Sequence, residues 1–159
     1  MTLVTKFLGG AVLTAAIAGT SFAASHLDPA VAGAISARKA HMQLYQHNAG
    51  TLFAMAQGKV DYDADSASAA ASNLATLATL KQQGYWIPGT DQETLGEDTR
   101  ALAAIWADGS DIGAKADAFV EASAAMNAVA GDGLDALKGA IGAVGGACNE
   151  CHKSFRGSR

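Results

Sequence analysis

Apolar residues recur at helical spacing from residue 28 to about residue 58. Asp28 followed by Pro29 is typical of a helix start, because the carboxylate caps the first free amides and proline fits the first helical position. Gly58 is typical of a helix end. The apolar positions are Val31, Ile35, Met42, Tyr45, Leu52 and Met55. This pattern predicts a long first helix with one buried face.

Three further segments show the same periodicity. The sequence predicts a second helix over residues 66–83, a third over residues 112–130 and a fourth over residues 134–155. Residues 85–98 are predicted to be irregular, and residues 99–106 to form a short helical turn. Four amphipathic helices with three connections predict an all-α fold, an antiparallel up-down four-helix bundle in which a cofactor lies between facing helices.

The composition is that of one domain. The chain has 159 residues, two prolines and a net charge of −4. It contains no tandem repeat and no linker rich in glycine, serine or proline that would divide it. Mild acidity without basic clusters argues against a nucleic-acid partner.

The first 23 residues have the features of a secretory signal peptide. Lys6 precedes an apolar run over residues 7–19, and Ser21-Phe22-Ala23 puts small residues at the two positions that determine cleavage. The run is short and rich in Gly, Ala and Thr, which disfavours an uncleaved membrane anchor. We therefore expect a signal peptide over residues 1–23, a mature domain over residues 24–159 without a membrane span, and a periplasmic location.

The strongest chemical signal is Cys148-Asn149-Glu150-Cys151-His152, in the last predicted helix. Two cysteines three positions apart with a histidine next are typical of a c-type haem attachment site. Each thiol adds across one vinyl group, and His152 then lies under the iron as its proximal ligand. A zinc site needs two more ligands at suitable spacing, and a thioredoxin-type pair opens a helix after a strand and does not require the histidine. The motif therefore predicts one covalently bound haem c per chain. This agrees with the export signal, because bacteria attach haem outside the cytoplasmic membrane.

The mature sequence resembles the class II c-type cytochromes, the cytochrome c prime family. The attachment motif lies within the last helix and is followed by Lys153-Ser154-Phe155-Arg156, similar to the family ending. Arg38-x-x-x-Met42 in the first helix and residues 58–64, 88–90 and 99–106 are also family-like. Ala103 departs from the family, where many members have proline, and this concerns a helix start rather than the haem. The resemblance implies a four-helix bundle with one haem.

Arg38 and Met42 are four positions apart and share one face of the first helix. In a bundle this helix faces the one that carries His152, so Met42 is expected on the opposite side of the iron. Arg38 is expected at the haem rim, where the two propionates need a cation. The resemblance also aligns Lys39, Thr99 and Arg100 with family positions along the haem edge. The alternative for these polar residues is solvated surface.

Two functions follow from two roles of Met42. If its sulfur ligates iron, the haem is six-coordinate and low-spin, its potential is raised, and the protein is an electron carrier. If Met42 only packs beside the iron as a core methionine, the iron is five-coordinate and binds small uncharged gases such as NO or CO. The Arg38-to-Met42 segment, the mid-chain loop and Ile105-Trp106 resemble the gas-binding members most, which favours the open site. One-electron transfer is compatible with both roles.

The remaining residues indicate no further chemistry. His41 lies about 100° around the first helix from Met42, so we expect His41 and His47 on the surface rather than as rival ligands. The sequence shows no acid–base pair or nucleophile dyad and does not predict an enzyme. The resemblance implies that homodimers are common, and the Ala- and Ser-rich faces of the first two helices permit one. The sequence does not identify a redox partner.

Overall fold

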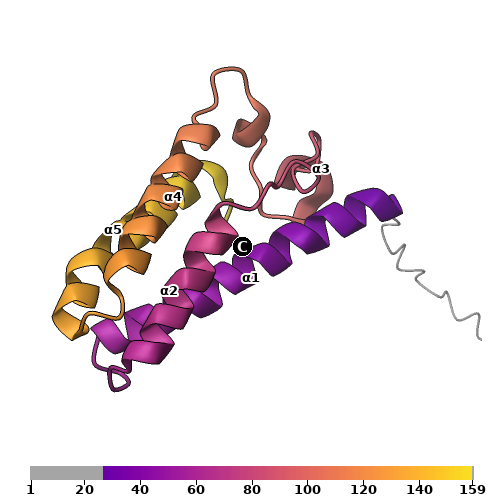
Figure 1. The fold of residues 1–159 in the computed structure, drawn as a ribbon. Coiled ribbons are helices and arrows are strands. Elements are labelled where there is room, and N and C mark those ends of the chain that lie inside the picture. The colour runs from indigo at the N-terminus through magenta and orange to yellow at the C-terminus, as the bar shows by residue number, and fades with distance from the viewer. Residues whose placement is uncertain (1–26, 159) are drawn as a thin grey trace, which may run out of the picture.

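Four long helices form most of the computed structural model, which describes residues 27–158. They are α1 (Pro29–Ala56), α2 (Ala64–Ala78), α4 (Ile112–Val129) and α5 (Leu134–Phe155). Successive long helices run antiparallel, and the packed neighbours are α1 with α2, α2 with α4, α4 with α5, and α5 with α1 (Figure 1). The predicted all-α antiparallel four-helix bundle is confirmed. The predicted signal peptide lies outside the described residues.

Local capping explains where α1 and α2 begin and where α1 ends. The carboxylates of Asp28 and Asp63 each accept hydrogen bonds from amides two or three positions further along. Gly58 follows α1 in a left-handed conformation with a φ of 66°, and the Lys59 amide donates to the Ala54 carbonyl at 2.9 Å. This is a Schellman motif, which favours glycine because other residues pay a steric penalty at positive φ.

The C-terminal end of α2 differs from the prediction. The sequence predicts a helix to Gln83, whereas α2 ends at Ala78. Leu80 is 48% exposed, so burial gives no reason for the helix to continue. The amides of Thr79 and Leu80 bond to carbonyls three positions back, which tightens the last turn into 3₁₀ geometry.

The connection between α2 and α4, residues 79–111, contains three short helices. They are α3 (Gln92–Leu95), η1 (Gly96–Asp98) and η2 (Ala103–Trp106). The first two fall in a segment that the sequence predicts to be irregular, so they correct that prediction. The Asp91 carboxylate starts α3 by accepting a bond from the Thr94 amide at 3.0 Å.

The helical turn predicted over residues 99–106 begins only at Ala103. The preceding residues are extended because they pair with the end of the chain. Ala101 and Arg156 form an isolated antiparallel bridge, and the Gly157 amide donates to the Arg100 carbonyl at 2.8 Å. The connection therefore lies across the C-terminal end of α5.

The two ends of the bundle are built differently. The turn end carries the short connections 57–63 and 130–133, and the motif end carries residues 148–152. Fully buried side chains pack the core at and near the turn end: Leu52, Leu74, Met126, Leu137 and Val144. The Tyr62 hydroxyl donates to the Ala130 carbonyl at 2.9 Å and accepts from the Gly133 amide at 3.0 Å. One phenol thus links both turns.

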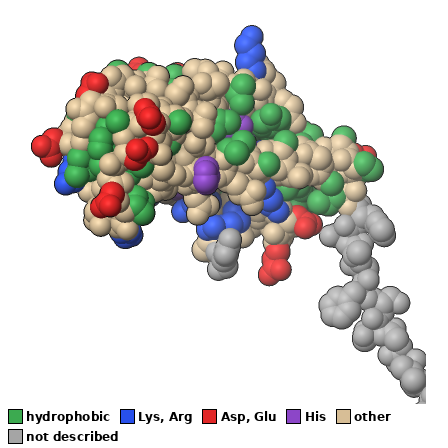
Figure 2. All heavy atoms as spheres, turned by 60° about the horizontal axis from the view of Figure 1, so that its bottom comes forward, with side chains coloured by type: hydrophobic (Ala, Val, Ile, Leu, Met, Phe, Trp, Pro, Cys, Tyr) green, Lys and Arg blue, Asp and Glu red, His purple; other side chains and the backbone are tan. Residues whose placement is uncertain are grey.

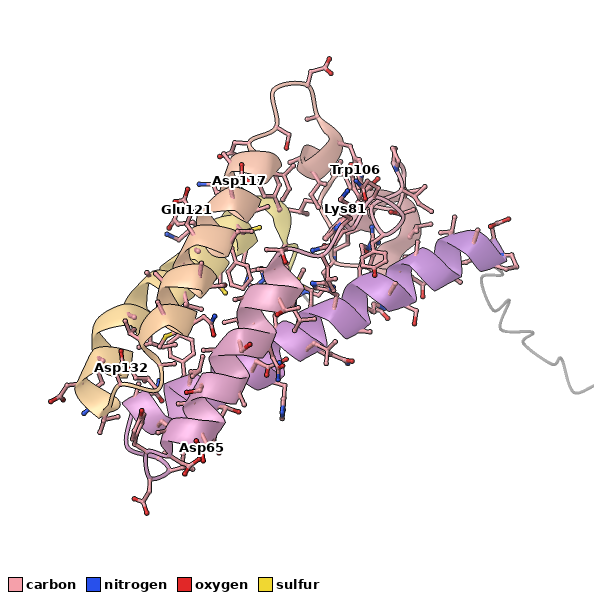
Figure 3. The ribbon with its side chains drawn as sticks, in the orientation of Figure 1. Asp65, Lys81, Trp106, Asp117, Glu121 and Asp132 are labelled. Atoms are coloured by element: carbon pink, nitrogen blue, oxygen red, sulfur yellow. The ribbon has the colours of Figure 1, made fainter. Side chains whose placement is uncertain are left out.

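Acidic side chains lie along the whole bundle. Asp65 and Asp132 lie at the turn end, whereas Asp117 and Glu121 lie further along α4, and Lys81 and Trp106 lie towards the other end (Figure 3). On the face drawn in Figure 2, acidic and basic side chains are otherwise interspersed among apolar and neutral ones. Within residues 27–158, no helix combines the length and the apolar character that a membrane crossing requires.

Candidate functional site

The thiols of the motif continue the buried stripe of α5. Leu137, Ile141 and Val144 are buried on the face that packs into the bundle. Cys148 and Cys151 follow at the same alternating steps of four and three residues, and both are half-buried. Residues at this spacing share one side of a helix. The helix therefore turns both sulfur atoms towards the bundle interior.

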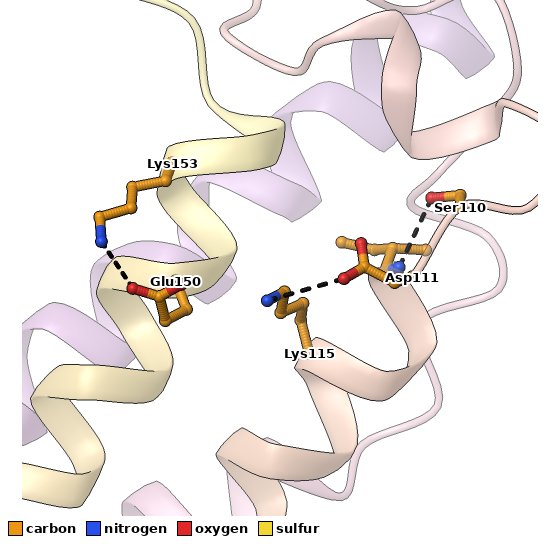
Figure 4. A network of polar contacts seen from close by, with 6 residues as sticks. Ser110, Asp111, Lys115, Glu150 and Lys153 are labelled. Carbon is orange, nitrogen blue, oxygen red and sulfur yellow. Dashed lines mark hydrogen bonds and ion pairs between the residues drawn. The ribbon is translucent and has the colours of Figure 1, made fainter.

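The intervening residues face outward. Asn149 and Glu150 are exposed, and Glu150 accepts a hydrogen bond from the Lys153 ammonium at 2.6 Å. Across from them on α4, Lys115 pairs with Asp111 at 3.6 Å (Figure 4). These exposed pairs add little to stability, but they mark the solvent side of the motif and leave its thiols on the inner side.

Burial disfavours the charged forms of the reactive groups of the motif. It raises the pKa of the Cys148 thiol, with Cys151 adding to the rise, and it raises the pKa of Cys151 as well. It lowers the pKa of His152, and the charges of Arg156 and Arg100 lower it further. A neutral imidazole has the lone pair that a metal ligand needs.

The donor set fits a covalently attached haem. Both cysteines are free, lie about one turn apart on the inward side of a helix, and are followed by a half-buried imidazole whose pKa is lowered. Two thiols and one axial nitrogen donor are what a c-type haem takes from its protein.

A close contact shows which side of α1 faces α5. The ring of Phe53 lies against the backbone of Gly145, where an added methyl group would be 2.9 Å from the ring Cζ atom. Met42 is eleven positions before Phe53, so it lies about 20° from it around α1. His152 is seven positions after Gly145, so it also lies about 20° from it around α5. Because the helices are antiparallel, Met42 and His152 stand on the same side of this contact.

Met42 is more exposed than the residues one heptad away. Its residue exposure is 37%, whereas Ile35 and Ala49, on the same stripe of α1, are 4% and 8% exposed. Figure 1 shows α1 diverging from α4 and α5 towards its N-terminal end. Divergence alone does not account for the exposure of Met42, because Ile35 lies further along α1 in that direction and is buried.

Arg38 is buried and joins α1 to the long connection. Its guanidinium donates to the Thr90 hydroxyl at 2.8 Å, to the Thr90 carbonyl at 3.2 Å and to the Thr99 hydroxyl at 3.2 Å. It also stacks 5.1 Å from the centroid of the Trp86 ring. Only 4% of the residue is exposed, and burial lowers its pKa. The structure thus brings together Arg38 and Thr99 from the predicted haem edge.

The two other predicted edge residues lie apart from that pair. Lys39 is exposed on α1. Arg100 is half-buried, and its Nε donates to the Gly157 carbonyl at 2.8 Å. Arg100 therefore fixes the chain end beside His152, whose pKa it helps to lower.

The expected surface position of His41 is wrong. His41 is 5% exposed, because the buried seam of α1 runs through positions 34, 38, 41, 45, 48, 52 and 55 rather than through Met42. Its ring meets Tyr45 edge-on at 4.5 Å, and its Nε2 lies 3.4 Å from the Gln82 amide nitrogen. His41 therefore points towards the end of α2 and not towards α5. His47 is exposed, as predicted.

Tyr45 and Gln82 are site residues that the sequence did not reveal. The Tyr45 hydroxyl donates to the Leu77 carbonyl at 3.2 Å, and its ring packs on Phe119 at 4.8 Å. Burial raises the pKa of Tyr45 to about 12, and the proximity of Cys148 contributes. The sequence placed Tyr45 among the apolar positions of the first helix. Nothing in the sequence distinguished Gln82 from an exposed helix residue.

Comparison with known proteins places the chain among cytochromes c′, with cytochromes c-554 also among its relatives. The family model described as Cytochrome C′ matches residues 33–156. A cytochrome c′ of Cereibacter sphaeroides is 42% identical over 79% of this chain and 83% of that protein. A solved Rhodobacter cytochrome c′ has a TM-score of 0.78 at 41% identity and covers 81% of this chain and 98% of its own. The nitric oxide complex of a cytochrome c prime variant from Alcaligenes xylosoxidans has a TM-score of 0.68 at 30% identity, over 84% of this chain and all of that one.

Proposed function

The chain belongs to the cytochrome c′ family and is a haem c protein, and from this premise we propose that it binds NO or CO at an open haem face and cycles one electron. Cys148 and Cys151 hold the group, and His152 is its proximal ligand. When bound, haem iron supplies one-electron chemistry and a position for a sixth ligand. Met42 lies opposite His152 without a strong bond to the iron.

The observation that carries this proposal is the relation between Met42 and His152. The Phe53–Gly145 contact fixes which faces of α1 and α5 oppose each other, and both residues lie on those faces. Met42 stands about 16 Å along α1 from the contact and His152 about 10 Å along α5. The helices diverge over this distance (Figure 1), which holds the thioether back from His152.

The surrounding side chains select neutral ligands. Met42 and the ring of Phe119 beside Tyr45 present apolar surface. A small anion entering such a site loses hydration without gaining a hydrogen-bond donor, which costs more than the about 2–7 kcal/mol for burying an unpaired uncharged polar group. A neutral diatomic gas has little hydration to lose. The nitric oxide complex of the Alcaligenes variant supports this ligand class.

Arg38 is proposed to donate hydrogen bonds to a haem propionate in addition to those that it donates to the connection between α2 and α4. A guanidinium carries five N–H donors, and three hydrogen bonds join Arg38 to Thr90 and Thr99. Its further donors suit a carboxylate. Lys39, Thr99 and Arg100 complete the polar edge.

The protein is further proposed to act in the periplasm, where it exchanges electrons with a redox partner. The support is the leader-like composition of residues 1–23 and the attachment motif, which requires export. N-terminal sequencing of protein from the periplasmic fraction should give a start near Ala24. Protein with an intact Met1 in the cytoplasmic fraction would contradict the location.

Optical spectra test the open site. We expect the ferric protein to be largely high-spin and the ferrous protein to bind CO, with little change in Met42→Ala. A low-spin ferric spectrum with a thioether–iron charge-transfer band, lost in Met42→Ala, would instead establish a six-coordinate electron carrier. Acid–acetone extraction should leave the haem attached to the wild type.

A further inference from the structure

The contact between Phe53 and Gly145 depends on the glycine. A methyl group at position 145 would lie 2.9 Å from Cζ and 3.5 Å from Cε1 of the ring, and carbon atoms pack best at about 3.5–4.0 Å. A methyl group at the nearby Gly142 or Gly146 would meet nothing within 4 Å. Position 145 is therefore where α5 lets the ring approach its backbone.

This contact lies where α1 and α5 begin to separate. Their interface is the least extensive of the four between neighbouring long helices. Leu52 and Val144 are fully buried beside the contact. Towards the motif end, Met42 is 37% exposed, and the helices diverge (Figure 1).

We propose that Phe53 and Gly145 are a positioning pair that sets the gap between Met42 and His152. The inference rests on the proposed function, because the gap decides whether the thioether reaches the iron or leaves a ligand position open. The pair lies seven or more positions along the chain from both Met42 and His152. It acts through the spacing of the two helices that carry Met42 and His152.

The geometry predicts whether each substitution widens or narrows the separation of α1 and α5. A methyl group on Gly145 would lie 2.9 Å from the ring tip, short of the 3.4 Å at which ordinary van der Waals contact begins, so either the Phe53 ring or α1 itself must shift. The positioning role requires that α1 shifts, which moves it away from α5 and withdraws Met42. Shortening the ring in Phe53→Leu removes the atoms that hold the helices apart and lets Met42 approach. The two substitutions therefore have opposite effects, and the double variant returns the spacing towards that of the wild type.

The experiment compares Gly145→Ala, Phe53→Leu and the double variant as mature haem-loaded proteins, with Gly146→Ala as the matched control. Crystal structures give the Cα separation of Met42 and His152. Ferric spectra give the high-spin fraction, and flash photolysis gives the CO association rate. We expect Gly145→Ala to widen the separation, raise the high-spin fraction and speed CO binding several-fold. Phe53→Leu should do the reverse, and Gly146→Ala should match the wild type.

Several results would overturn the positioning role. One is an unchanged helix separation in Gly145→Ala, with only the Phe53 ring rotated. Another is a shift of the same sign in Gly145→Ala and Phe53→Leu, and a third is an equal effect in Gly146→Ala. These results do not depend on whether the wild-type haem has an open ligand position. If the wild type is low-spin, Gly145→Ala should still raise its high-spin fraction, because the sign depends only on the helix spacing.

Discussion

The two ends of this bundle share four helices but differ in what holds them together. On the buried seam of α1, Leu52 and Met55 lie towards the turn end, whereas Arg38 and His41 occupy the same seam towards the motif end. On α5 the buried stripe likewise changes from leucine, isoleucine and valine to the two cysteines. The period of the helix is unchanged, and only the chemistry of the inward positions differs.

This difference separates the interactions that stabilise the fold from those that require a specific partner. Apolar burial near the turn end contributes free energy in proportion to area, without needing a particular partner. Each buried polar group at the motif end needs its own partner, because an unpaired one costs more than a pair gains. The motif end has a small apolar cluster of Ala101, Ile105 and Phe155, and it also depends on specific hydrogen bonds, such as those from Arg38 to Thr90 and Thr99.

The largest expected effect comes from opening a cavity in the apolar half. Leu52 is fully buried, so Leu52→Ala should lower the free energy of unfolding by about 2–5 kcal/mol, measured by urea denaturation. The Soret spectrum should stay that of the wild type. Leu44→Ala, at a position that is 49% exposed, should cost less than about 0.5 kcal/mol. A changed Soret band in Leu52→Ala would show that the two ends are not independent.

A smaller and more local effect is expected at the motif end. Arg38→Lys keeps the charge but cannot reproduce the planar fork that bonds both threonines. It should lower the free energy of unfolding by about 1–3 kcal/mol. Hydrogen exchange should speed up at amides of residues 90–100 and stay slow in the turn-end helices. Lys39→Ala, at the exposed neighbour, serves as the control. Uniformly faster exchange would mean that Arg38 supports the whole bundle.

Protonation of His41 should weaken the motif end in acid. Burial lowers the pKa of His41, and a hydrogen bond with the Leu77 backbone opposes that shift. The folded state then binds fewer protons than the unfolded state below about pH 6.5, so stability is fully present above that pH and falls as the pH drops. The slope is at most about 1.4 kcal/mol per pH unit. Urea denaturation across this range should show a shallower slope in His41→Gln than in the wild type, and an unchanged slope in the exposed control His47→Gln. Equal slopes in all three would contradict the assignment.

The smallest effect is expected at Ser123. Its hydroxyl is fully buried, and among the described residues it has no hydrogen-bond partner. Ser123→Ala should leave stability unchanged or raise it by up to about 1 kcal/mol, because no hydrogen bond is lost. Ser68→Ala is the control, since that exposed hydroxyl bonds the Ala64 carbonyl at 2.8 Å. A clear loss of stability in Ser123→Ala would point to an undetected partner.

The sequence predicted the helices well where local signals mark them. Asp28 and Gly58 bound α1 in the structure, Asp28 through its side chain and Gly58 through its freedom at positive φ. The end of α2 was wrong because an apolar residue, Leu80, continues the periodicity without being buried. The hydrophobic periodicity shows which side chains could be buried, whereas the packing of the neighbouring elements decides which side chains are buried.

The site was predictable only in part. The motif spacing is local, so the sequence alone indicated the inward side of α5. The burial of His41 was missed because the sequence pattern placed Met42 on the buried face of α1. Buried polar residues such as His41 do not appear in a hydrophobic pattern. The Arg38 bonds to Thr90 and Thr99 span 52 and 61 positions. No local pattern encodes such pairings, nor the approach of Phe53 to Gly145.

The Tyr62 link between the two turns also bears on the order in which parts of the chain fold. The hairpins α1–α2 and α4–α5 have short connections, so each closes over a small loop. The bonds from Tyr62 to Ala130 and Gly133 span 68 and 71 positions, and such a closure costs chain entropy before the packing of the two hairpins repays it. We therefore expect the two hairpins to close before they dock, and we expect docking to be the slower step.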